Sequence, residues 1–119
     1  MAERFLRKSD SGAQVVARIF EPEEIGQSSE WSCKIEVQGL GEPYERSIIG
    51  VDSFQALCSA LRVLCAYVER HEQNLVFLDG EEGDCGLPLI MPWDFGAALK
   101  AEMYELINSK IEEKFSGST

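Results

Sequence analysis

Four carboxylate side chains fall within six residues of this chain: Asp79, Glu81, Glu82 and Asp84. Carboxylate oxygens are the ligands that Ca²⁺ prefers, and an acidic surface also speeds encounter with a basic protein. The spacing is not that of an EF-hand, because Gly80 and Gly83 are misplaced and no glutamate stands at the twelfth position. Cation binding by the 79–84 loop is therefore kept as an alternative, and we predict no dedicated metal site.

A nucleophile with a base beside it is the second chemistry to consider, and His71 is the only histidine. Cys58 precedes it by thirteen residues, so the two lie about 20 Å apart on one helix and cannot pair. Cys85 lies in a loop that could approach His71. Asp52 could act as an acid or base, although a role as helix cap accounts for it. Since no nucleophile elbow, P-loop or dinucleotide-binding pattern is present, we predict no catalytic residue and no cofactor.

The chain is strongly acidic, with 21 acidic and 11 basic residues and a formal net charge of −10. The excess lies mainly in residues 51–119, which hold 12 acidic and 5 basic side chains. Such a field repels phosphate backbones and anionic membrane surfaces, so we predict neither nucleic acid nor membrane as a partner. It attracts a basic protein, although negative charge also simply keeps a small protein soluble.

The cysteines and the absence of an apolar leader predict a location in the cytoplasm. The longest apolar stretch, residues 56–68, is too short and too polar to cross a bilayer. Cys58 and Cys65 are seven residues apart on the predicted helix, too far for a disulfide. With Cys33, they are expected to be small buried side chains.

The elements that must position these residues begin with strands over residues 3–8, 14–20, 31–38 and 44–49. Residues 31–38 alternate strictly between apolar and polar side chains, which is typical of an antiparallel strand with one buried face. Gly39 to Pro43 forms the turn of a hairpin, and Pro22 to Ser29 is a polar loop.

Helices are predicted over about 52–72 and 93–115, with a short strand at 75–78 paired inside the sheet. Asp52, or Ser53, caps the first helix, and Gln55 completes a capping box. Its expected buried stripe is Phe54, Leu57, Leu61, Leu64 and Val68. The stripe of the second helix is Phe95, Leu99, Met103, Leu106 and Ile111. The order β-β-β-β-α-β-α predicts a single α+β domain over residues 1–119: an antiparallel sheet of four to five strands with two helices packed on one face.

Several short motifs resemble a family of small bacterial single-domain proteins of unknown function. The motifs are Trp31-x-Cys33, Gly39-Leu-Gly, Gly50-Val-Asp-Ser-x-Gln-Ala-Leu57, Leu78-x-Gly80 and Leu87-Pro88. In that family a GVDS-x-QAL segment opens the main helix. The resemblance covers residues 31–88 and implies a fold, but no activity.

We therefore expect a non-enzymatic protein-interaction module, with an immunity- or antitoxin-like role as one form of it. Its predicted partner-binding residues for a basic protein are Glu81, Glu82, Asp84 and Trp93. A small-molecule or divalent-metal binding protein is the alternative. A third hypothesis is a homodimer formed through the apolar stripe on residues 95–111.

Overall fold

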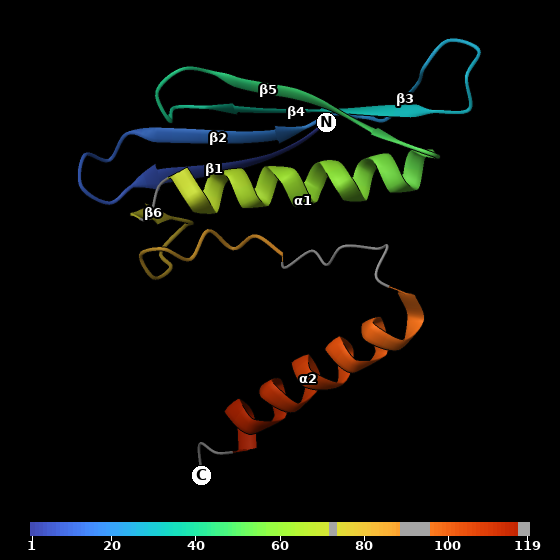
Figure 1. Ribbon diagram of the computed structural model, residues 1–119. Helices are drawn as coiled ribbons and strands as arrows, with labels where there is room; N and C mark the ends of the chain where they lie inside the picture. The colour runs from blue at the N-terminus through green and yellow to red at the C-terminus, as the bar shows by residue number, and fades with distance from the viewer. Residues whose placement is uncertain (72–73, 89–95, 117–119) are drawn as a thin grey trace.

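The computed structural model describes residues 1–71, 74–88 and 96–116, and it confirms the α+β class. An antiparallel sheet forms one layer and a long helix, α1, lies across one of its faces (Figure 1). The second helix, α2, stands apart from both layers.

Each strand of the sheet runs antiparallel to its neighbours: β1 (Ala2–Lys8), β2 (Gln14–Ile19), β3 (Glu23–Glu24), β4 (Trp31–Gln38), β5 (Tyr44–Gly50) and β6 (Leu75–Val76). β4 pairs with β5 on one side and with both β2 and β3 on the other. β1 lies beyond β2, and β6 pairs with β1 at the far edge. The predicted hairpin is confirmed as β4 and β5, in which Trp31 pairs with Gly50.

Two strands depart from the predictions. The sequence predicts a loop at β3, because two glutamates carry no apolar alternation, yet β3 pairs with Trp31 and Ser32 of β4. The apolar run of β6 predicts a strand inside the sheet, but β6 pairs with β1 alone. Leu75 and Val76 are nevertheless buried. A strand at the edge of a sheet can therefore bury the side chains on both of its faces, because a helix or loop can cover that edge.

Helix α1 (Ser53–His71) packs on the sheet through a stripe that shares Leu64 and Val68 with the predicted one but differs from it in the first two turns. Ala56, Ala60 and Val68 are fully buried and Leu64 is nearly so, whereas Phe54 is 75% exposed and Leu57 is 38% exposed. Small alanine side chains let the helix approach β4 and β5 closely. The prediction that Phe54 and Leu57 are buried is therefore wrong, because the close approach turns the alanines inward.

The turn into α1 explains why a glycine and a carboxylate stand there. A Cβ atom on Gly50 would lie 2.4 Å from the backbone nitrogen of Ala56, so only glycine fits. The amide of Gln55 donates to Asp52 Oδ1 at 2.7 Å, and the amide of Val51 donates to Gln55 Oε1 at 2.5 Å. The predicted capping role of Asp52 is confirmed.

Helix α2 (Gly96–Ser116) is present but buries none of its residues. It packs on neither the sheet nor α1, so the prediction of two packed helices holds for α1 and not for α2. Neither α1 nor α2 has the length and apolar character needed to span a membrane, as far as the chain is described.

Candidate functional site

The acidic loop, residues 79–84, leaves the sheet at its β6 edge and is held by its own backbone. The amide of Gly83 donates to the carbonyl of Leu75 at 2.8 Å, and the amide of Gly80 donates to the carbonyl of Phe77 at 3.0 Å. The amide of Gly86 donates to Asp84 Oδ1 at 2.9 Å. These bonds fix the course of the loop, so its side chains project from a defined frame.

Arg4 of β1 binds the segment that follows the acidic loop. Its guanidinium donates to the carbonyl of Gly86 at 2.6 Å and to that of Cys85 at 3.4 Å. It also stacks on the Phe77 ring, 3.9 Å from the ring centroid. Arg7 donates to the carbonyl of Leu78 at 3.4 Å. Two basic residues of β1 therefore bind backbone oxygens around the acidic loop.

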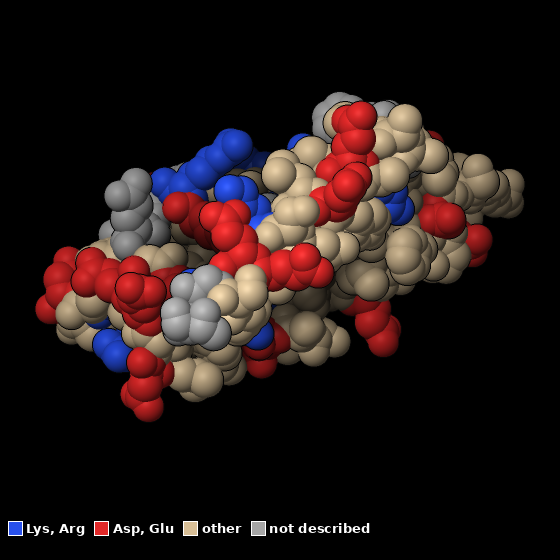
Figure 2. Space-filling model, turned by 90° about the horizontal axis from the view of Figure 1, so that it is seen from below, with Lys and Arg blue, Asp and Glu red and all other residues tan. Residues whose placement is uncertain are grey.

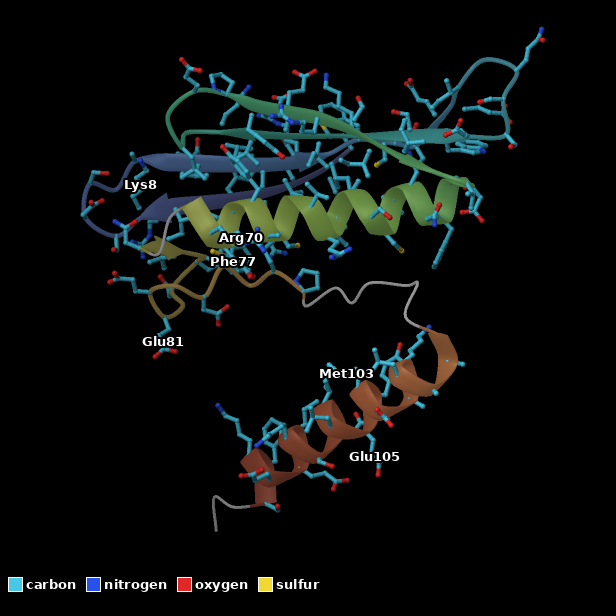
Figure 3. The ribbon with its side chains drawn as sticks, in the orientation of Figure 1. Lys8, Arg70, Phe77, Glu81, Met103 and Glu105 are labelled. Carbon is cyan, nitrogen blue, oxygen red and sulfur yellow. The ribbon has the colours of Figure 1, made fainter. Side chains whose placement is uncertain are left out.

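The carboxylates of the acidic loop face solvent. Every residue from 79 to 84 is exposed. Among the ion pairs between described residues, none involves Glu81, Glu82 or Asp84. Figure 3 shows Glu81 pointing away from α1, toward the side on which α2 lies. On the face in Figure 2, one group of acidic side chains lies at one end with basic ones near it, and further acidic side chains are spread over the rest of the face. The loop therefore offers concentrated negative charge to a partner.

Leu78 is a residue that sequence reasoning missed, because the apolar run places it at the end of a predicted strand. Its φ is +57°, a left-handed conformation that costs a bulky residue free energy, and its side chain is 71% exposed. A large apolar side chain thus stands in water immediately before the carboxylates. Protein interfaces combine a buried apolar core with a polar rim, and an exposed leucine beside carboxylates can supply one residue of each kind.

The two alternative chemistries find little support in the described residues. No group of three or more histidine, cysteine, aspartate or glutamate side chains among them is placed to hold a metal ion. Cys85 is buried, and burial raises the pKa of its thiol, as do the charges of Glu69 and Asp84. It is therefore a neutral thiol near pH 7 and a weak nucleophile. The side chain of His71 lies outside the described residues.

The structure brings three of the four predicted partner-binding residues together. Glu81, Glu82 and Asp84 share one exposed loop. The fourth, Trp93, lies outside the described residues. Cysteines behave largely as predicted, since Cys33 and Cys65 are buried and Cys58 is half-buried, all as free thiols.

The comparisons with known proteins identify the family and no activity. A family model described as a domain of unknown function, DUF6968, matches residues 2–89. That range holds the six strands of the described residues, α1 and the acidic loop, and it ends before α2. No curated protein and no solved structure matches the chain. Because the match spans most of its length, the chain belongs to the DUF6968 family of domains of unknown function.

Proposed function

We propose that the protein is a non-enzymatic interaction module that binds a basic protein surface through the acidic loop. The observation that carries the proposal is the exposure of its carboxylates on an anchored frame, unpaired by any basic side chain in the described ion pairs. Charges already neutralised within the fold would attract a partner only weakly. Those of the acidic loop form no ion pair among the described residues, so no direct partner neutralises them.

The frame supports the proposal as strongly as the charge. A loop that must be ordered on binding loses conformational entropy at that moment, whereas a pre-ordered loop does not. Arg4 and the turn bonds of Gly80 and Gly83 supply that order here. Leu78 adds an apolar side chain that a partner can cover, which would offset the cost of its backbone conformation.

One concrete form of such a module is an immunity- or antitoxin-like protein that neutralises a basic enzyme in the bacterial cytoplasm. The resemblance through the GVDS-x-QAL segment supports a bacterial origin for this form. In it, the acidic loop would speed association, because opposite charges steer the encounter.

The test follows the amide NMR signals of the ¹⁵N-labelled chain during titration with cytochrome c, a small basic protein. We expect the largest shifts at residues 78–84, weakening as salt is added. A variant carrying Glu81→Gln, Glu82→Gln and Asp84→Asn should lose most of these shifts. Asparagine retains a side-chain oxygen for the Gly86 amide, so the loop should keep its course.

The matched control removes the same charge at the opposite end of the sheet. Glu23→Gln, Glu24→Gln and Glu30→Gln change exposed residues at and near β3. This control should bind cytochrome c at the acidic loop almost as the unmodified chain does. Equal losses in both variants, or shifts spread over the whole surface, would show that only net charge matters and would refute the proposal.

A further inference from the structure

Helix α2 carries a broad apolar face that the fold leaves uncovered. At about 100° per residue, the following side chains fall on one side of the helix: Leu99, Met103, Leu106, Ile107 and Ile111. Leu99 is 39% exposed, Leu106 52% and Ile111 49%. An open groove of about 430 Å³ on this side is lined by Leu106, Ile107, Lys110, Ile111, Lys114 and Phe115. An amphipathic helix gains most of its stability from covering such a face, so α2 lacks its main stabilising contact.

The charges of α2 are sorted between its two sides. Its three lysines, Lys100, Lys110 and Lys114, all fall on the apolar side. Its four glutamates, at positions 102, 105, 112 and 113, fall on the remaining side. Figure 3 shows this division at Met103 and Glu105, which point in opposite directions from the helix. The apolar face of α2 is therefore also its basic face.

The existing contacts of these lysines leave the charge available to a partner. Lys110 Nζ lies 3.6 Å from Glu113 Oε2, but both side chains are more than 70% exposed. Such a pair within one helix is weak. Lys110 and Lys114 line the groove with the apolar side chains.

The chain outside α2 has the complementary character. Residues 1–95 hold 17 acidic and 8 basic side chains. Their most concentrated exposed charge is the acidic loop, with the uncovered Leu78 at its start. We infer that the basic face of α2 binds the acidic loop of a second copy of this chain, with Leu78 against the groove. This inference rests on the proposed function, and it identifies α2 of a second copy as the basic surface that the acidic loop binds.

A two-fold dimer satisfies both copies at once. In an isologous arrangement each α2 meets the acidic loop of the other copy, so the contact forms twice. Pairing α2 directly with α2 would instead bring lysines of both helices onto one apolar seam, where like charges repel. Electrostatics therefore favours a dimer in which each α2 contacts the acidic loop of the other copy over a dimer in which the two α2 helices pair.

Sedimentation velocity of charge-reversed variants tests this pairing. One variant carries Lys110→Glu and Lys114→Glu, and the other carries Glu81→Lys and Glu82→Lys. The unmodified chain should sediment as a dimer, at twice 13.3 kDa. Each variant alone should be a monomer, because both contacts then join like charges. An equimolar mixture should form dimers again, since both contacts of the mixed pair join opposite charges.

Glu102→Lys with Glu105→Lys is the control, because it reverses two charges on the side of α2 opposite the groove and should leave the dimer intact. A monomeric unmodified chain, variants that remain dimeric, or a mixture that stays monomeric would overturn the inference. The cytochrome c titration, repeated on the Lys110→Glu and Lys114→Glu chain, separates the two claims. Loop shifts there with no dimer anywhere would overturn the self-association alone, whereas no loop shifts would overturn the proposed function.

Discussion

Replacing Gly50 with alanine tests the close approach between β5 and α1. A Cβ atom there would lie 2.4 Å from the nitrogen and 2.8 Å from the Cα of Ala56. Both are backbone atoms, so no side-chain rotation relieves the overlap, and the first turn of α1 must move. The φ of Gly50 is not left-handed, so alanine is otherwise acceptable at this position.

The expected magnitude follows from two opposing effects. Alanine restricts the unfolded chain and would stabilise the fold by about 0.4–1 kcal/mol if it fitted. Overpacking a well-packed site costs about 1–3 kcal/mol, and more where backbone must shift. We expect a net loss of about 1–3 kcal/mol in the free energy of unfolding, or a fall in Tm of the order of 3–10 °C for a chain of this size.

Urea unfolding followed by tryptophan fluorescence and far-UV circular dichroism measures this loss. Gly26→Ala is the matched control, because Gly26 has a φ of +53° and a Cβ atom added to it would meet no atom within 4 Å. It should cost only about 1 kcal/mol, from backbone conformation alone. A Gly50→Ala chain as stable as the unmodified protein would refute the close packing of α1 on β5.

Three further expectations concern the elements around the acidic loop and α1. Arg4→Ala should speed amide exchange around the acidic loop, and a fall of about 1–2 kcal/mol in stability is expected from its lost charged hydrogen bonds; unchanged exchange would contradict its anchoring role. Asp52→Ala should cost about 1 kcal/mol by thermal unfolding while Asp52→Asn costs less, since asparagine also caps helices. Burial raises the pKa of Cys65 and Cys85, so their thiols stay neutral in the fold. Their contribution to stability should be complete below about pH 8.5 and fall as pH rises through the folded pKa values. Urea midpoints that rise with pH above about pH 8.5 would contradict this. Cys58, the least buried of the four cysteines, should react first with iodoacetamide.

The features that could be predicted from the sequence are those in which one pattern has one physical cause. Strict alternation in residues 31–38 predicts the bounds of β4, because only an extended strand places every second side chain on one face. Gly50 and Asp52 mark the turn into α1, because the close contact requires glycine and the cap requires an oxygen acceptor.

The errors arise where tertiary packing chooses between equivalent local patterns. The pair Phe54 and Leu57 and the pair Ala56 and Ala60 both have helical spacing. Only the distance between α1 and the sheet decides which pair faces the sheet. The exposure of Leu78 depends on a turn conformation that no neighbouring residue specifies. Periodicity predicts helix α2, but periodicity does not tell whether the surface covering it belongs to the same chain.

The acidic loop of one copy and the basic face of α2 of another can be tested for contact by zero-length cross-linking. An equal mixture of ¹⁴N and ¹⁵N chains would be allowed to exchange and then treated with a carbodiimide, which joins carboxylates to lysines in direct contact. We predict cross-links between Glu81 or Glu82 and Lys110 or Lys114, half of them joining peptides of different isotope. Cross-links confined to peptides of the same isotope, or none between these residues, would contradict the exchange of α2 between two copies.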